Sequence, residues 1–334
     1  MKEALFFTAL PHDEVQCRLC PHECRLKPGQ RGLCRVRVNR GGCLVTENYG
    51  LLAAFSEDPI EKKPLYHYFP GSMILSAASF GCNLHCPWCQ NWSLSQGDLQ
   101  GEYFSPEQLV RLMKSKGERR IAFTYSEPLM WYEFILDFAS SSLWEEDRPE
   151  IVLVTNGYIN HEPLKRVMPY IKAVNLDVKA FNEKIHRAVT GGGLKPVLDN
   201  AVFLYQQGVH LELTYLIVPG FNDEREQISS FIQWIKESLS AQIPVHFSRY
   251  FPSWKWKAPP TRPEVLDEAL EMARRSLHYV YGGNIDTPGV TFCPVCRKAV
   301  IHRQGYTVKN YLIQDGKCPF CGERIAGCFI TGAV

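Results

Sequence analysis

The chain has 334 residues, 45% of them hydrophobic and 22% charged, which is typical of a globular protein and argues against the disordered and fibrous classes. Lys and Arg nearly balance Asp and Glu, so the formal net charge of +2 gives no global footprint of a nucleic-acid-binding protein. An acidic stretch follows the first ten residues too soon for a secretory signal, and no apolar run reaches the length of about 18 residues that predicts a membrane helix. We expect a cytoplasmic protein with no membrane or nucleic-acid partner.

Thirteen cysteines lie in three groups along the chain. Groups of three or four thiols at two- or three-residue spacing are typical of metal binding, which we favour over disulfides. The stretch between Cys89 and Cys293 contains no cysteine. We therefore divide the chain into a Cys-rich head over residues 1–70, a body over 71–286 and a tail over 287–334, and we expect the head to be rich in loops.

The body alternates short apolar runs with longer amphipathic ones, which predicts β-α units and a parallel sheet. We expect strands near 74–79, 120–125, 151–155, 172–177, 211–218 and 243–248. Ser105, followed by Pro106 and Gln108, predicts a helix start with a capping box. Apolar residues between 228 and 239 predict a helix with one buried face, for which Asn222 is the expected N-cap. Six such units favour an α/β fold with a partial (β/α)6 TIM-like barrel over a doubly wound sheet, although periodicity alone does not separate the two.

Cys82, Cys86 and Cys89 form a C-x3-C-x2-C segment directly after the first strand of the body. In a barrel, active sites lie on the loops that follow the strands. A cubane cluster has four irons, so three thiolates leave one iron free to bind a substrate or cofactor, whereas electron-transfer clusters normally have four cysteine ligands. The segment predicts an open [4Fe-4S] cluster; the alternative is a zinc site completed by His85 or a distant residue.

This spacing, with the aromatic Trp88 just before the third cysteine, resembles the defining motif of the radical S-adenosylmethionine (radical SAM) superfamily. The resemblance implies that Cys82, Cys86 and Cys89 hold a [4Fe-4S] cluster whose free iron binds the methionine part of SAM. One electron from the cluster would then split the bond from sulfur to C5′ and give a 5′-deoxyadenosyl radical. A reducing partner of the flavodoxin or ferredoxin type would supply that electron.

Polar residues follow the next strands of the predicted barrel. Glu127 ends the second strand, where a carboxylate is placed to bind the amino group of SAM; the superfamily has Gly-Gly-Glu there, which Tyr125 and Ser126 do not match. Thr-Asn-Gly after the third strand and Asp-x-Lys after the fourth resemble elements of pyruvate formate-lyase activating enzymes that surround SAM. The expected cofactor-binding residues are Trp88, Glu127, Asn156, Asp177, Lys179, Ile217 as an apolar edge for adenine, and His246 and Arg249 at the end of the sixth strand.

The whole order of cysteine motifs resembles the AmmeMemoRadiSam-system radical SAM enzymes. Cys-x2-Cys-x3-Cys comes first, the radical SAM body follows, and Cys-x2-Cys pairs end the chain. The resemblance includes Ile60–His67, a stretch that we would otherwise interpret as a surface linker. It implies partner proteins of that system.

The tail contains Cys293 and Cys296, then Cys318 and Cys321 after 21 intervening residues. This spacing predicts a zinc-ribbon or rubredoxin-like site, with zinc favoured over iron. Cys328 is left over, and we expect it to be a small buried apolar residue.

The head offers four further thiols, those of Cys17, Cys20, Cys24 and Cys34. They fit either a second [4Fe-4S] cluster or a structural zinc. In glycyl-radical activases additional clusters follow the SAM motif, whereas these cysteines precede it.

Three classes of function fit the cysteine content: a radical SAM enzyme, an iron-sulfur or rubredoxin-like electron carrier, and a zinc-dependent interaction module. Only the first explains an open three-cysteine site followed by polar residues at successive strand ends. We expect a radical SAM enzyme, with oxidoreductase chemistry of the activating-enzyme type, that acts on a small molecule. A glycyl-radical enzyme activase is the alternative.

Overall fold

The computed structural model describes residues 1–145 and 148–329, and within them the largest sheet has eight strands in the order β16-β15-β14-β13-β12-β11-β9-β8. Seven of the strands run parallel, and β8 pairs antiparallel with β9. Their bounds are β8 (Ala54–Pro59), β9 (Met73–Ala78), β11 (Arg120–Phe123), β12 (Glu150–Thr155), β13 (Ile171–Asp177), β14 (His210–Ile217), β15 (Val245–Arg249) and β16 (Val280–Gly283).

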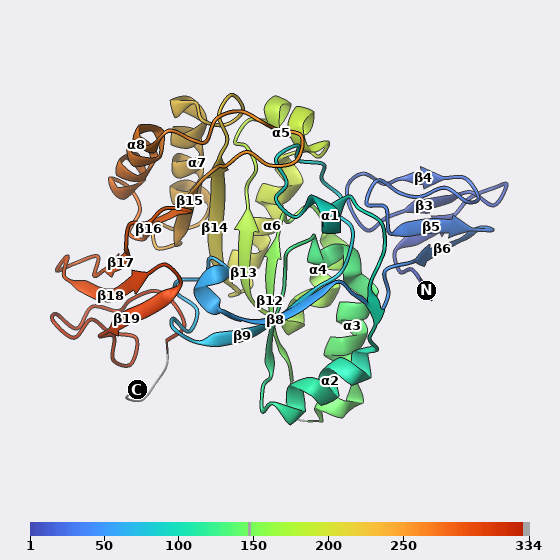
Figure 1. The fold of residues 1–334 in the computed structure, drawn as a ribbon, viewed down its shortest axis with the longest axis horizontal. Helices are drawn as coiled ribbons and strands as arrows, with labels where there is room; N and C mark the ends of the chain where they lie inside the picture. Colours follow the sequence, from blue (N-terminus) through green and yellow to red (C-terminus); the bar gives the residue numbers. More distant parts are fainter. Residues whose placement is uncertain (146–147, 330–334) are drawn as a thin grey trace.

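The sheet curves into a barrel that is not closed, since β8 and β16 are its two edges (Figure 1). The prediction of a parallel α/β sheet is confirmed, and the six predicted strands correspond to β9 and β11 to β15. The predicted number of six is too low, because β16 adds a seventh parallel strand. β8, which comes from the predicted head, extends the sheet by a further strand.

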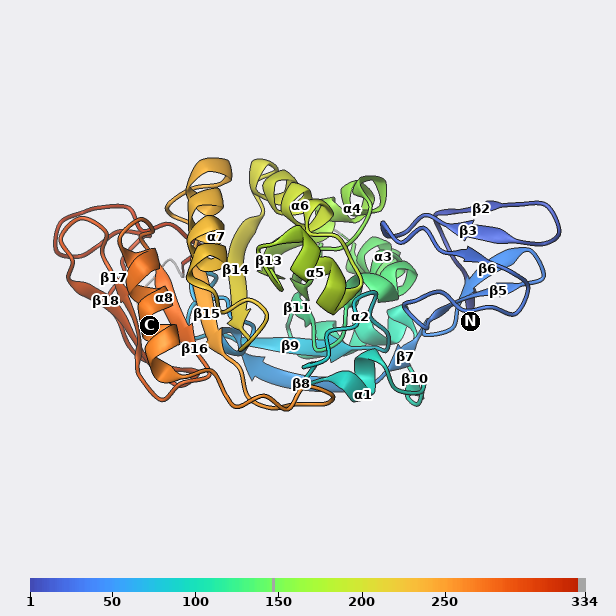
Figure 2. The same cartoon turned by 90° about the horizontal axis from the view of Figure 1, so that it is seen from above.

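Helices cover the outer face of the sheet (Figure 2). On α7, Ile228, Phe231, Ile232 and Ile235 are all buried, which confirms the predicted apolar face. The described helices are α1 (Trp92–Ser95), α2 (Pro106–Ser115), α3 (Tyr132–Ser140), α4 (His161–Val167), α5 (Glu183–Thr190), α6 (Lys195–Gln206), α7 (Arg225–Ser238) and α8 (Pro263–Arg274), with 3-10 turns at Ile60–Lys62, Pro128–Trp131, Ser142–Trp144 and Met168–Tyr170.

The two predicted helix caps have different outcomes. Ser105 caps α2 with a complete capping box to Gln108, as predicted. Asn222 is not the N-cap of α7, a position that Glu224 occupies. The Asn222 side chain instead accepts from Val218 N and donates to the carbonyl oxygens of Lys179 and Leu216. It therefore joins the ends of β13 and β14, because a buried amide satisfies several backbone groups at once.

Residues 60–68 close the amino end of the barrel and are not a surface linker. Ile60, Leu65 and Tyr68 form an apolar cluster with inward-facing residues of the strands, including Val152 and Ala173. The backbone N–H groups of residues 66 and 67 donate to the carboxylate of Glu212 on β14. This packing leaves the carboxyl end of the barrel as the place for a site.

The head is a pair of small sheets beside α3 (Figure 1). Short strands and long connections confirm that it is rich in loops. Arg37 and Glu133 are both 1% exposed and form an ion pair that ties the head to α3. The strands are β1 (Lys2–Glu3), β2 (Phe7–Ala9), β3 (Val15–Cys17), β4 (Arg25–Leu26), β5 (Arg37–Arg40) and β6 (Cys43–Thr46), and β7 (Leu51–Leu52) pairs with β10 (Glu102–Tyr103).

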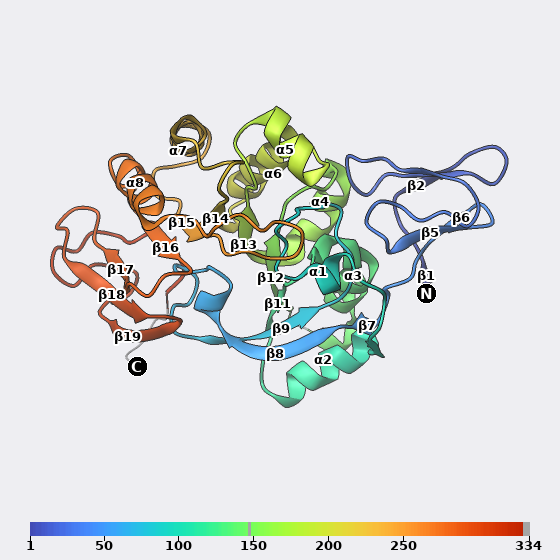
Figure 3. The same cartoon turned by 45° about the horizontal axis from the view of Figure 1, so that its top comes forward.

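The tail lies at the opposite end of the molecule from the head (Figure 3). It has an antiparallel sheet of β17 (Gly289–Phe292), β18 (Ala299–Gln304) and β19 (Thr307–Tyr311). Arg303 on β18 is buried, donates to the carbonyl oxygen of Tyr66 at 2.6 Å and pairs with Glu61, so the tail is anchored on residues 60–68. None of the helices in the described residues is long and apolar enough to span a bilayer.

Candidate active site

The cysteine loop begins where β9 ends, at the carboxyl end of the parallel sheet. Gly81 has a φ of 94°, and a Cβ there would lie 2.8 Å from the carbonyl oxygen of Cys34. Only glycine fits this position, because both the left-handed backbone and the close approach exclude a side chain. The loop that carries Cys82, Cys86 and Cys89 therefore packs directly against the head.

Each end of the loop offers donors to a thiol. Cys82 Sγ accepts from Leu84 N at 3.4 Å and from Asn156 Nδ2 at 3.6 Å, and Cys89 Sγ lies 3.3 Å from Ser95 Oγ. Burial raises the pKa of Cys86 to about 12. Thiols held neutral by burial but supplied with N–H donors are suited to metal binding, which replaces the proton with a cation. Ser95 was not among the predicted residues, since nothing in the sequence brings it to Cys89.

Glu127 follows β11 and is only 4% exposed. It accepts from Thr155 Oγ1 at 2.6 Å, Asn156 N at 2.8 Å and Leu129 N at 3.1 Å. Burial raises the pKa of Glu127 to about 7, against the effect of these donors. The carboxylate thus joins the end of β11 to the end of β12, next to the Asn156 amide that contacts Cys82.

Tyr125 occupies a position where the superfamily pattern has glycine, and its backbone takes a left-handed φ of 70°. Its hydroxyl donates to Asp58 on β8, and Lys63 Nζ lies 3.2 Å from the same hydroxyl. These contacts hold the side chain away from the cysteine loop and compensate the backbone strain. Tyr125 therefore has a backbone conformation that glycine adopts more readily than other residues.

Asp177 and Lys179 lie together after β13, with Lys179 Nζ 2.8 Å from the Asp177 carboxylate. Although burial disfavours the ammonium, the Asp177 carboxylate raises the pKa of Lys179, so it stays charged. A cation beside Cys86 offsets part of the negative charge that thiolates would bring to this loop.

Trp88 is 3% exposed and packs on Phe221, at 5.1 Å between ring centroids. Its neighbour Pro87 accepts from the backbone N–H groups of Lys255 and Trp256, both at 3.0 Å. A segment that follows β15 therefore lies across the cysteine loop.

Three predicted cofactor residues lie in other surroundings. Ile217 is fully buried and shares a face of β14 with Tyr215, which packs against Phe231 of α7, so its side chain is directed to the helix layer. His246 hydrogen-bonds Glu212 at 2.7 Å, in a buried network toward the amino end of β14. Arg249 ends β15 and donates to the carbonyl oxygen of Thr261.

The comparisons with known proteins give the family. An uncharacterized protein of Methanocaldococcus jannaschii is 37% identical over 336 aligned positions, which cover 97% of this chain and 99% of that protein. The sequence model of the radical SAM superfamily matches residues 78–232, from the last residue of β9 into α7. The chain belongs to the radical SAM superfamily. It is therefore an enzyme of that superfamily.

Other radical SAM relatives are more distant. The pyruvate formate-lyase-activating enzyme of Clostridium pasteurianum is 26% identical over 178 residues, which are 50% of this chain and 72% of that enzyme. Among solved structures, Streptococcus suis SuiB bound to S-adenosylmethionine has a TM-score of 0.50 at 14% identity, over 70% of this chain and 56% of that one. That likeness shows the fold.

The cysteine loop fits the cluster and SAM that radical SAM membership implies. Three thiols in one loop, without a fourth cysteine up to residue 292, leave one iron of a cubane open. The hydrogen-bond donors at Cys82 and the cation at Lys179 suit an anionic cluster. The residues that would hold the cluster are Cys82, Cys86 and Cys89.

The tail thiols form a second kind of site. Cys293 Sγ lies 3.5 Å from Cys321 Sγ, and Cys296 Sγ lies 3.6 Å from Cys318 Sγ. All four sulfurs lie within 4.8 Å of one another, which fits a tetrahedral ion bound by four thiolates. Cys328 is partly rather than fully buried; it packs against the apolar cluster that contains Tyr68, and its backbone bridges that residue.

Replacing Glu127 by Gln is expected to weaken SAM binding about tenfold, while the absorption spectrum of the cluster stays unchanged. A glutamine replaces one acceptor oxygen by an NH2 group. One of the donors from Leu129, Thr155 or Asn156 then loses its partner. A buried donor without a partner costs about 1–3 kcal/mol in free energy. Titration of SAM into the anaerobic protein measures the affinity, with exposed Glu102→Gln as the control. Unchanged affinity in Glu127→Gln, Asp177→Asn and Lys179→Met would contradict the assignment of these residues to SAM.

Proposed function

We propose that this chain is a radical SAM enzyme of the AmmeMemoRadiSam-system type that acts on a small molecule. When bound at Cys82, Cys86 and Cys89, the cluster and SAM supply a 5′-deoxyadenosyl radical, which abstracts a hydrogen atom from the substrate. The order of the cysteine motifs supports the type, and the superfamily supports the chemistry.

The observation that carries the small substrate is the segment 250–262, which covers one side of the cysteine loop. Besides the two backbone bonds to Pro87, Ser253 Oγ donates to the carbonyl oxygen of Cys89 at 3.2 Å. Trp254 stacks parallel to Trp92, with ring centroids 6.2 Å apart, just after the cysteine loop. A loop of a large protein would have to displace these contacts, whereas a small molecule would not.

The chain's own residues have separate proposed roles at this site. Lys179 holds its charge beside Cys86, and Asn156 orients the loop through Cys82. Glu127, Asp177 and Trp88 remain proposed SAM contacts at the ends of β11 and β13 and in the cysteine loop. Ile217, His246 and Arg249 are also proposed to line the SAM site, and their side chains pack or pair elsewhere in the structure.

The proposed cleavage of SAM also requires an electron donor and a reducing compartment. A low-potential donor of the flavodoxin or ferredoxin type supplies the electron, and proteins of the AmmeMemoRadiSam system are the proposed partners. Thirteen cysteines, unpaired in the structure, suit the reducing cytoplasm.

At the tail we propose zinc rather than iron. We also propose the three-part division of the chain at residues 70 and 286.

A glycyl-radical activase is the second candidate, because the relatives include pyruvate formate-lyase-activating enzymes at 26% identity over half of this chain. Our proposal predicts no glycyl radical when the reduced, SAM-treated enzyme is mixed with glycyl-radical enzymes from its own organism. Electron paramagnetic resonance measures this directly. A persistent glycyl doublet that disappears with Cys82→Ala would replace the small-molecule proposal by the activase.

A further inference from the structure

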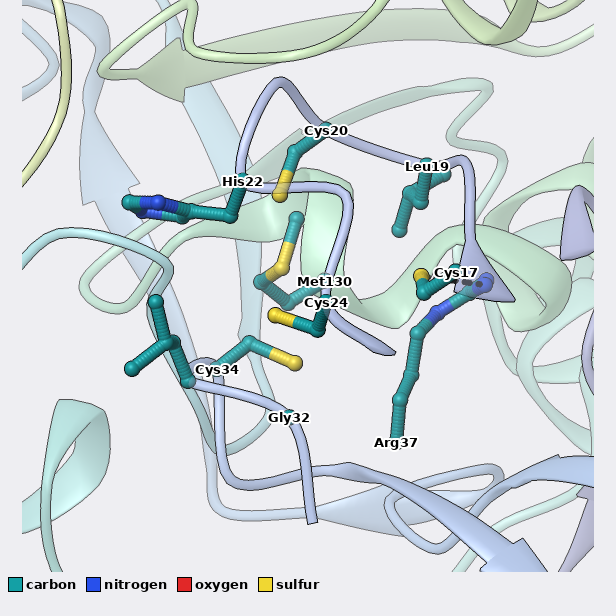
Figure 4. A pocket seen from close by; sticks show the side chains of 10 residues that line it. Cys17, Leu19, Cys20, His22, Cys24, Gly32, Cys34, Arg37 and Met130 are labelled. Atoms are coloured by element: carbon teal, nitrogen blue, oxygen red, sulfur yellow. Dashed lines mark hydrogen bonds between the residues drawn. The ribbon is translucent and has the colours of Figure 1, made fainter. Parts of the chain in front are cut away.

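Four cysteines of the head line one cavity, separate from the cysteine loop of the body. Cys17 ends β3, Cys20 and Cys24 lie in the connection from β3 to β4, and Cys34 precedes β5 (Figure 4). Leu19 and Met130 line the same cavity, which gives it apolar walls. Cys17, Cys20 and Cys34 are less than 8% exposed. In a buried cavity of this kind, four thiols are either inert or hold a metal centre.

A buried cation lies against one of these thiols. Buried Arg37 places Nη1 at 3.7 Å from Cys17 Sγ. A cation near sulfur favours a thiolate, so Arg37, which also pairs with Glu133, supports an anionic ligand at Cys17.

The spacing of the thiols separates a single ion from a polynuclear cluster. Around one tetrahedral zinc, with a Zn–S distance of about 2.3 Å, the sulfurs lie about 3.8 Å apart. The tail sulfurs, with pairs at 3.5 Å and 3.6 Å, nearly match this spacing. In the part of the chain that the structure describes, only the tail brings three or more metal-ligating groups within 4.8 Å of one another. The head thiols are therefore spread more widely around their cavity, as ligands of different irons in a cubane must be.

The head site touches the cysteine loop of the body at two points. The carbonyl oxygen of Asn83, next to Cys82, lies 2.7 Å from Nε2 of His22, which lines the cavity of the head cysteines, and the Asn83 side chain accepts from Asn156 Nδ2 at 3.0 Å. On the other side of Cys82, Gly81 packs against the carbonyl oxygen of Cys34. Both flanks of Cys82 are thus in direct contact with the head.

We propose that Cys17, Cys20, Cys24 and Cys34 bind a second [4Fe-4S] cluster, closed by four thiolates and adjacent to the Cys82 loop. The cavity that the four thiols line, their spread around it and the contact of Arg37 with Cys17 carry the proposal. Four protein ligands leave no iron open, so this cluster does not bind SAM. The proposal does not depend on SAM cleavage by the body.

The test uses the full-length variant Cys82→Ala/Cys86→Ala/Cys89→Ala, reconstituted anaerobically with iron and sulfide. We expect about four irons and four sulfides per chain and the Mössbauer signature of a [4Fe-4S] centre. Adding Cys24→Ser and Cys34→Ser should remove both, whereas Cys43→Ser, a cysteine of the same head outside the cavity, should not. Retained zinc in the tail shows that the variants are folded.

A variant without sulfide, or with a second zinc per chain in its place, would overturn the proposal. If the triple variant does not fold, the reconstituted wild-type chain decides: about eight irons support a second cluster and about four exclude it. Failure of the proposed enzyme function gives a different result, namely eight irons without SAM cleavage.

Discussion

The variant Cys82→Ala/Cys86→Ala/Cys89→Ala is expected to lose all SAM-dependent change in the electron paramagnetic resonance of the reduced protein. Formation of 5′-deoxyadenosine should fall to the background level. The reason is that these three thiols lie in one loop after β9 and are the proposed ligands of the open cluster, so the variant removes all of its proposed protein ligands. Single Cys→Ala changes should give the same loss, since a cubane with two protein ligands is not retained.

The matched control is Cys43→Ala, which removes a partly buried thiol of β6 that takes part in none of the three sites. It should keep the SAM response and the product at wild-type level. If the triple variant still cleaves SAM, then the ligands of the active cluster lie elsewhere, and the assignment of the cysteine loop fails.

Replacing Cys318 by Ser should release the tail metal and unfold the tail, with a loss of several kcal/mol in stability. The four tail sulfurs lie within 4.8 Å of one another, and metal binding to such a site supplies folding free energy directly. The apolar cluster of the tail is small, and Val300 and Ile301 share it with tyrosines from outside the tail, including Tyr281. Limited proteolysis and thermal unfolding measure the effect, and the yield of folded protein should fall as well.

Cys328→Ser provides the control for the tail, because Cys328 is outside the group of four sulfurs. It should leave the metal content and the melting temperature nearly unchanged. A soluble Cys318→Ser protein with normal melting and no tail metal would show that the site is not structural.

The strands of the body could be predicted because their apolar runs are separated by amphipathic helices. β16 was missed since Val280–Gly283 is short and ends in two glycines. β8 was missed because Ala54–Pro59 contains polar residues and a proline, which do not resemble a buried strand. Both are edge strands, where the sequence signal is weakest.

The role of residues 60–68 could not be predicted, because it depends on partners far along the chain. Glu61 pairs with Arg303, and the backbone at His67 binds Glu212. Charged residues are predicted to be exposed unless such partners are known. The same limit applies to Glu127, whose three donors come from another strand and from its own turn.

The position of the cysteine loop could be predicted from the spacing of its cysteines. The direction of the side chains at the strand ends could not. Asp177 and Lys179 lie together near Cys86, whereas Ile217 is directed to the helix layer. Neighbouring residues of a strand face opposite sides, so an error of one position moves a side chain from the barrel interior to its outside.

The most direct test of the account is the chromatographic measurement of 5′-deoxyadenosine and methionine after anaerobic reduction of the reconstituted wild-type enzyme with SAM. We expect both products to form in equal amounts, only when reductant and SAM are present together, and not in the variant that lacks Cys82, Cys86 and Cys89. An enzyme with a complete, reducible cluster that leaves SAM intact would contradict it.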